Sequence, residues 1–132
     1  MKSKKSVLIL TDGTPATEKM AAGIAETLKG NKVLAKTASE FAGNDILPAD
    51  AFFLGCENPI PESFAYITDL FKHINLAGRT CGVFSPGTKR TVSYLAALIK
   101  DCEAALNPEF LTGTSPDIKN WARNVINKTY LY

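Results

Sequence analysis

Three stretches of the chain are apolar at nearly every position, and each is followed by a polar or turn-forming segment. They cover residues 7–10, 51–56 and 81–84. A continuous apolar run of this length is typical of a strand that is buried on both faces of a parallel sheet. Two further stretches, residues 32–37 and 109–112, are shorter or more polar, and they predict strands nearer the edge of the sheet.

Between these stretches the apolar residues recur every three or four positions, as on one face of a helix. The pattern predicts four helices: one from Pro15 to about residue 28, one from Glu62 towards Gly78, one over 92–106 and one opened by Ser115-Pro116-Asp117. Thr14 is the expected N-cap of the first. Residues 38–50 have no clear period and predict a loop with one helical turn near Glu40 and Phe41.

Five strands that alternate with four helices predict an α/β fold of three layers, α-β-α, around a five-stranded parallel sheet. Parallel neighbours need crossover connections, and right-handed crossovers place helices on both faces of the sheet. No repeat or linker divides the chain, so we expect one domain over residues 1–132.

The composition is that of an ordinary folded domain, with 132 residues, 45% hydrophobic and 21% charged. A net charge of +2 without a long basic block argues against nucleic-acid binding. The apolar run after the N-terminal lysines is too short for a signal peptide or a membrane span, so a cytoplasmic protein is expected. Three cysteines without CxxC spacing predict reduced thiols and no metal site.

Ligands of open parallel sheets bind beyond the carboxyl ends of the strands, which here are followed by three loops. The first loop runs from Thr11 to Glu18, carries three threonines and opens a helix, whose free N–H groups favour phosphate. The second and third loops cover residues 56–61 and 85–90. The predicted contact residues are Thr11, Asp12, Gly13, Thr14, Ala16, Thr17, Cys56, Glu57, Asn58, Ser85, Pro86 and Gly87.

The strand, the hydroxyl-rich turn and the helix, with Leu54-Gly55-Cys56 later in the chain, resemble the flavodoxin family. The phosphate loop of that family has the form Ser/Thr-x-Thr-Gly-x-Thr, and its two later threonines match Thr14 and Thr17. The resemblance implies strand order 2-1-3-4-5, non-covalently bound FMN and electron transfer to a redox partner protein.

The same register reveals departures from the family pattern. It places Asp12 where the family has a hydroxyl and Pro15 where it has glycine; proline offers no N–H, and a carboxylate repels phosphate. The second and third loops contain no aromatic residue to stack on a flavin, and Lys89 and Arg90 reverse the family's acidic character. Tyr94 fits a ring contact and a helix-packing residue equally well. An Asp-Gly turn followed by a Thr-Pro helix start explains the first loop without any ligand.

Two function hypotheses therefore stay open. One is an FMN-binding electron carrier or reductase component, and the other is a flavodoxin-fold module that has lost flavin and binds a protein partner or a small anion. A receiver domain is disfavoured because the acceptor aspartate and the lysine are missing, and a hydrolase because no Ser/His/Asp set is present. No catalytic residue is predicted.

Isolated residues with reactive side chains are expected to have structural roles. Cys56 ends a strand at the expected site and would be a reactive thiol only if Lys89 or a helix start lowered its pKa; packing is the favoured interpretation. Cys81 and Cys102 lie within apolar runs, and Trp121 lies on the apolar stripe of the last helix, which predicts core packing. His73, the one histidine, suits a helix C-terminus.

Overall fold

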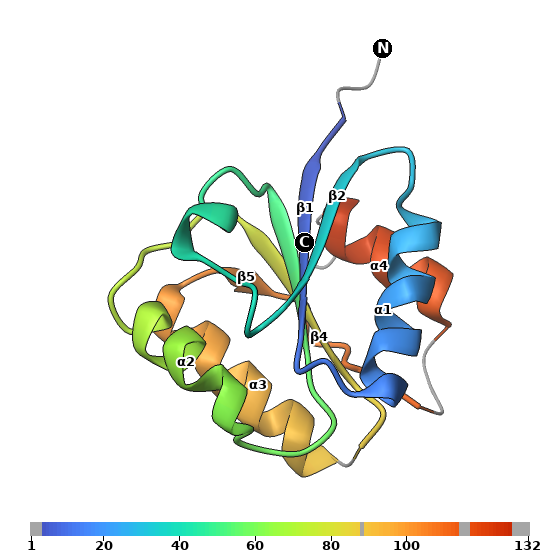
Figure 1. Ribbon diagram of the computed structural model, residues 1–132. Helices are drawn as coiled ribbons and strands as arrows, with labels where there is room; N and C mark the ends of the chain where they lie inside the picture. The colour runs from blue at the N-terminus through green and yellow to red at the C-terminus, as the bar shows by residue number, and fades with distance from the viewer. Residues whose placement is uncertain (1–3, 88, 114–116, 128–132) are drawn as a thin grey trace.

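The computed structural model describes residues 4–87, 89–113 and 117–127, which form a parallel sheet between two pairs of helices (Figure 1). Strand β1 (Ser6–Thr11) pairs with β2 (Lys32–Thr37) on one side and with β3 (Ala51–Gly55) on the other. Next come β4 (Thr80–Ser85) and β5 (Ala105–Leu106), and β6 (Leu111–Thr112) also pairs with β4. The order β2-β1-β3-β4-β5 confirms the predicted topology.

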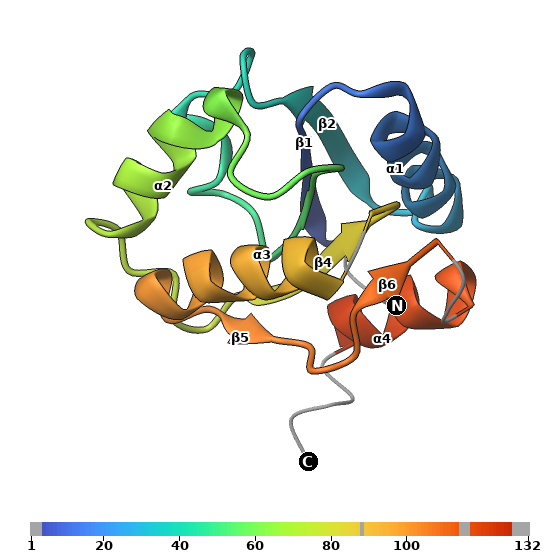
Figure 2. The same ribbon diagram turned by 90° about the horizontal axis from the view of Figure 1, so that it is seen from below.

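The helices cover the two faces of the sheet in pairs. On one face lie α1 (Pro15–Thr27) and α4 (Ile118–Asn127), and on the other lie α2 (Ala65–Phe71) and α3 (Lys89–Cys102) (Figures 1 and 2). The predicted three-layer arrangement is therefore confirmed. The predicted helix start at Ser115-Pro116 lies outside the described residues. No helix in the described part of the chain is long and apolar enough to cross a membrane.

Two helices end earlier than the apolar spacing predicts. The second was expected to reach Gly78, but a 3₁₀ turn (Glu62–Phe64) precedes α2 and the helix ends at Phe71. The chain leaves the helix because buried Leu76 packs in the core and its N–H donates to the Cys102 carbonyl at 2.7 Å. Similarly, α3 ends at Cys102, and Glu103 has a left-handed backbone (φ 65°) that turns the chain back along the sheet.

The predicted final strand is shifted and divided. Leu106 was expected on the third helix but lies in β5, and the strand expected over residues 109–112 begins only at Leu111. Both β5 and β6 pair with β4, and Asn107 bridges them: its N–H donates to the Cys81 carbonyl at 2.8 Å. The helical spacing of Leu106 is therefore coincidental, because the chain has already reversed direction at Glu103.

A separate apolar cluster fills the space on each face of the sheet. Under α1 and α4, Trp121 is fully buried and meets the rings of Phe53 and Phe84 edge-on, with centroids 5.4 and 6.5 Å away. Cys81 and Cys102 are fully buried in the cluster under α2 and α3. The packing roles predicted for Trp121 and these two cysteines are confirmed.

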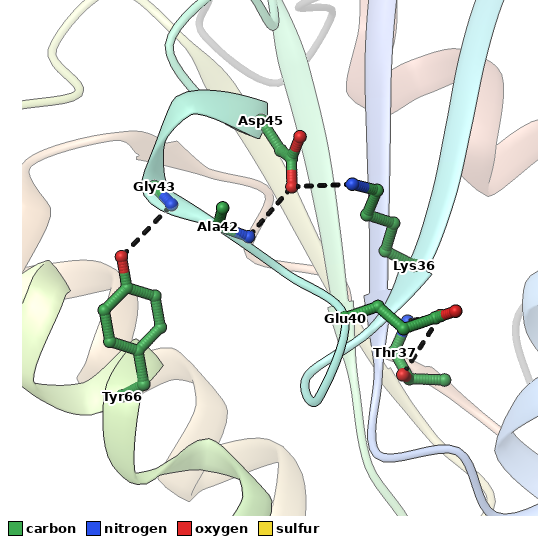
Figure 3. Close-up of polar contacts among 7 residues, drawn as sticks. All are labelled: Lys36, Thr37, Glu40, Ala42, Gly43, Asp45 and Tyr66. Carbon is green, nitrogen blue, oxygen red and sulfur yellow. Dashed lines mark hydrogen bonds and ion pairs between the residues drawn. The ribbon is translucent and has the colours of Figure 1, made fainter.

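The connection between β2 and β3 is held by carboxylates that accept backbone hydrogen bonds (Figure 3). Glu40 accepts the Thr37 N–H at 3.0 Å, and Asp45 accepts the Ala42 N–H at 2.9 Å and pairs with Lys36 at 3.1 Å. The turn expected near Glu40 is present, because the Glu40 and Phe41 N–H groups donate to the Thr37 carbonyl at 3.0 and 3.1 Å. A 3₁₀ turn over Gly43–Asp45, which was not predicted, follows it. It forms there because Asp45 caps the turn and the Tyr66 hydroxyl accepts the Gly43 N–H.

These contacts give the connection a pH dependence with a defined sign. Hydrogen bonds from Thr37 lower the pKa of Glu40, and those from Ala42 and Lys36 lower the pKa of Asp45. A carboxyl whose pKa is lower in the folded state stabilises the fold above its ordinary pKa, and that contribution is lost as the pH falls through the folded value. We therefore expect Glu40→Gln and Asp45→Asn to flatten the decline of stability below about pH 4.5.

Urea unfolding between pH 7 and pH 3 measures this effect. The matched control is Glu26→Gln, which removes an exposed carboxylate on α1 that pairs with Lys29. If all three variants followed the wild-type pH dependence, the stabilising role of Glu40 and Asp45 would be wrong.

Candidate ligand site at the carboxyl edge of the sheet

The loops after β1, β3 and β4 lie together at one edge of the sheet, which Figure 2 views from below. This follows from the parallel strands, because all their carboxyl ends reach the same edge. The predicted contact residues in these loops are thus neighbours in space, and their polar groups largely bind one another.

The first loop is closed by the Asp12 carboxylate. Its Oδ1 accepts the Thr14 N–H at 3.1 Å and the Thr14 hydroxyl at 2.8 Å. The Thr14 and Thr17 hydroxyl oxygens are themselves 2.8 Å apart. Thr14 has the extended backbone of an N-cap, as expected, but its side chain binds Asp12 and Thr17 and caps no backbone N–H.

Thr11 and Glu18 form a second contact within this loop. The buried Thr11 hydroxyl donates to the Glu18 carboxylate and accepts the Gly13 N–H at 3.3 Å. Gly13 has a left-handed backbone (φ 82°), which the turn requires and which glycine adopts without strain. Glu18 lies within the loop recognised from the sequence but was not among the predicted contact residues, because its tie to Thr11 depends on the folded turn.

The second loop is bound to both of its neighbours through Glu57. The Glu57 N–H donates to Asp12 Oδ2 at 2.8 Å, which joins the second loop to the first. The Glu57 carbonyl faces the third loop, where a methyl group added to Gly87 would collide with it, and it lies 3.4 Å from the Thr91 hydroxyl. Ser85 is buried, and its hydroxyl accepts the Gly87 N–H at 2.9 Å. Thr91 was missed by the sequence reasoning because only the fold brings it to Glu57.

Besides Cys56, three predicted contact residues form none of the hydrogen bonds that join the loops in the described part of the chain. Ala16 lies exposed in the first turn of α1, Asn58 is exposed in the second loop, and Pro86 is partly buried in the third. None of these three residues therefore helps to hold the loops together through a hydrogen bond.

Cys56 is buried at the base of these loops, with no exposed surface. Burial, together with the negative charge of Asp12, raises the pKa of its thiol to about 12. The condition for a reactive thiol is therefore not met, because both influences disfavour the thiolate. The burial of Cys56 in the apolar cluster under α2 and α3 confirms the favoured packing role.

We expect Cys56 to resist alkylation in the native protein. A pKa near 12 in place of 9.0 leaves roughly a thousandfold less thiolate at pH 8. Iodoacetamide labelling followed by mass spectrometry of tryptic peptides would measure this, with labelling in guanidinium as the control that exposes all three cysteines. Rapid native modification of Cys56 would show that its thiol is accessible and ionised.

Tyr94 lies beside the second loop, where it lines a groove together with Ile60 and Pro61. Tyr94 is partly buried and packs against the cluster under α2 and α3. Burial raises the pKa of Tyr94, and a hydrogen bond with the Thr68 side chain opposes that shift. His73 lies just beyond the end of α2, where its Nδ1 is 2.9 Å from the Asp69 carbonyl oxygen.

The residues at this edge fit an FMN phosphate poorly. Helix α1 begins here with two hydroxyls, as a phosphate site needs. However, Asp12 brings a negative charge, Pro15 brings no N–H, and both hydroxyls are hydrogen-bonded within the loop. No group of three potential metal ligands occurs among the described residues.

This protein is similar to known proteins in its structure but not detectably in its sequence. No family model and no curated protein matches the sequence. A short-chain flavodoxin associated with a bacterial microcompartment superposes with a TM-score of 0.82 at 16% identity, covering 96% of this chain and 99% of that one. Flavodoxin 2 from Bacillus cereus gives 0.80 at 20% identity, with the same coverage. A Fusobacterium nucleatum flavodoxin bound to flavin mononucleotide gives 0.73 at 10%, covering 94% and 98%.

The sequence identities are low, but the likeness extends over almost the whole of each chain. Together with the strand order β2-β1-β3-β4-β5 and the helices on both faces, it shows that this protein has the flavodoxin-like fold.

Proposed function

We propose that this protein is a flavodoxin-fold module that works without flavin and binds a protein partner at the carboxyl edge of its sheet. The observation that carries the proposal is Ile60, in the second loop. Its side chain is 72% exposed and its backbone is left-handed, with φ at 54°. A β-branched residue is rarely found in this conformation, which costs on the order of 1–3 kcal/mol and occurs mainly at functional sites.

The surroundings of Ile60 suit a protein surface. Beside it, Pro61 and Tyr94 line a groove of about 430 Å³ between the second loop, α2 and α3. At the start of α3, on the same edge of the sheet, Lys89 and Arg90 are exposed, and no ion pair joins them to the described residues. A partner that offers an apolar recess for Ile60 and carboxylates for these two cations would complement this edge.

The competing function is electron transfer through bound FMN to a redox partner protein, with the chain as a carrier or reductase component. Its support is the fold, and the Thr14 and Thr17 hydroxyls at the start of α1. If FMN bound here, the flavin would supply the redox chemistry and these hydroxyls would hold its phosphate. The flavin-free module accounts better for the acid at residue 12 and for the two loops without aromatics.

Site-specific photo-crosslinking tests the proposal. A benzophenone amino acid at position 60, expressed in the native host, should give one discrete adduct after irradiation. Leu47 is the matched control position, since it is 50% exposed and precedes β3 at the opposite edge of the sheet. Reversing charge with Lys89→Glu and Arg90→Glu should reduce the adduct severalfold, because like charges would then face the partner.

The same crosslinks at positions 60 and 47, or none at position 60, would contradict partner binding at this edge. An adduct yield that is unchanged by Lys89→Glu and Arg90→Glu would contradict the acidic character assigned to the partner.

A further inference from the structure

The carboxylate of Asp12 collects hydrogen bonds from two different loops. Its Oδ1 accepts the Thr14 N–H and the Thr14 hydroxyl, and its Oδ2 accepts the Glu57 N–H at 2.8 Å. Backbone N–H and hydroxyl donors at the start of a helix are the groups that bind phosphate oxygens in other proteins. In this protein a side chain of the chain itself takes up those donors.

The flavodoxin-like fold implies a phosphate group at this place, and the residues present disagree with it. Thr17 is fully buried, and its hydroxyl is bound to that of Thr14, which in turn donates to Asp12. Pro15 removes one of the N–H groups at the helix start. The Glu18 carboxylate, held by Thr11, adds a second negative charge to the same loop.

We propose that Asp12 is a built-in anion that replaces the phosphate of a ligand and excludes it. The carboxylate accepts both Thr14 donors of the first loop, and its negative charge repels an incoming phosphate. Because it also holds Glu57, it fastens the first and second loops together. This inference rests on the proposed flavin-free function, for which it names the determining residue.

Two substitutions separate the charge of Asp12 from its hydrogen bonds. Asp12→Asn keeps an acceptor oxygen for Thr14 or Glu57 but removes the negative charge. Asp12→Ser removes both carboxylate oxygens, and leaves the Thr14 and Glu57 N–H groups open to an external anion. Adding Pro15→Gly to Asp12→Ser supplies one more N–H at the start of α1.

Titration calorimetry and ¹H–¹⁵N spectra with inorganic phosphate, followed by FMN, provide the test. We expect no saturable phosphate binding by the wild type, and at least tenfold tighter binding by Asp12→Ser, with a further gain on adding Pro15→Gly. Asp12→Asn should gain less, because its side chain still fills the site. Asp101→Ser is the matched control: it makes the same charge change on an exposed residue of α3.

Amide hydrogen exchange tests separately whether the hydrogen bond between Asp12 and the Glu57 N–H holds the two loops together. The Glu57 amide should exchange at least tenfold faster in Asp12→Ser than in the wild type, while amides at the centre of β1 keep their rates and show that the sheet is intact. The Asp101→Ser control should leave the Glu57 rate unchanged.

Phosphate binding by Asp12→Ser no tighter than by Asp101→Ser, with the sheet intact, would overturn the proposal. So would an unchanged exchange rate at Glu57. If Asp12→Ser does not fold, Asp12→Asn provides the test. The proposal then requires that Asp12→Asn bind phosphate more tightly than Asp101→Ser, and equal binding would overturn it. Tight FMN binding by the wild type would instead overturn the flavin-free function itself, so the two failures are distinguishable.

Discussion

Replacing Trp121 with alanine is expected to lower the free energy of unfolding by about 3–5 kcal/mol, the usual cost of removing a large buried aromatic side chain. Trp121 has no exposed surface and packs edge-on against Phe53 and Phe84. Its indole N–H also donates to the Glu109 carbonyl at 2.7 Å, which connects α4 to the chain just before β6. Truncation therefore leaves a cavity and an unpaired carbonyl. Chemical denaturation measured by far-ultraviolet circular dichroism gives the loss.

Trp121→Phe separates the two contributions. Phenylalanine retains most of the ring contacts with Phe53 and Phe84 but cannot donate to Glu109, so a smaller loss is expected. A loss below about 1 kcal/mol for alanine would place Trp121 outside the core and contradict the packing of α4 on the sheet.

Replacing Gly55 with alanine is expected to destabilise the protein by about 1–3 kcal/mol, the usual cost of overpacking a core. Gly55 is the last residue of β3 and pairs with Phe84 of β4. A methyl group at this position would overlap the buried Phe84 ring. Because Cys56 follows directly, the strain would act at the base of the second loop. Thermal and urea unfolding of the variant provide the measurement.

Two variants control for other effects of the substitution. Gly30→Ala adds the same methyl group at a position with open space around it, so little destabilisation is expected. In a Phe84→Leu background, Gly55→Ala should reduce the free energy of unfolding by less than it does in the wild type, because the smaller side chain leaves room for the methyl group. Equal losses in the two glycine variants would show that the Phe84 ring does not restrict this position.

The hydrophobic pattern was enough to predict the central architecture. The apolar runs at residues 7–10 and 51–56 correspond to β1 and β3, which are buried on both faces and form the middle of the sheet. The pattern failed where tertiary contacts decide the backbone. Leu106 has helical spacing to Cys102, but the left-handed turn at Glu103 and pairing with β4 place it in a strand.

The sequence also predicted that the loops after the first, third and fourth strands meet at the carboxyl edge, because that edge follows from a parallel sheet. It did not reveal how the loops hold one another. The contact between Asp12 and Glu57 joins residues 45 positions apart, and the close approach of Gly87 to Glu57 depends on β3 pairing with β4. The left-handed backbone of Ile60 has no signal in the sequence, because isoleucine normally avoids that conformation.

The affinity of this edge for phosphate depends on three residues. Thr14 and Thr17 keep the hydroxyls of a phosphate loop, but the Asp12 carboxylate accepts the Thr14 N–H and hydroxyl, and the Thr17 hydroxyl pairs with that of Thr14. A carboxylate about 4 Å from a phosphate costs about 4 kcal/mol per pair of unit charges at an effective dielectric constant near 20. Two hydroxyls contribute about 1.5–3 kcal/mol each through hydrogen bonds to a charged group, and here they already have partners.

The most direct test of the flavin-free edge is the visible absorption spectrum of the purified protein, recorded before and after incubation with excess FMN and desalting. We expect a colourless protein in both spectra, and no quenching of FMN fluorescence when the protein is added. Flavin bands that persist through desalting, with quenched fluorescence, would contradict the flavin-free function and establish an FMN protein in spite of Asp12.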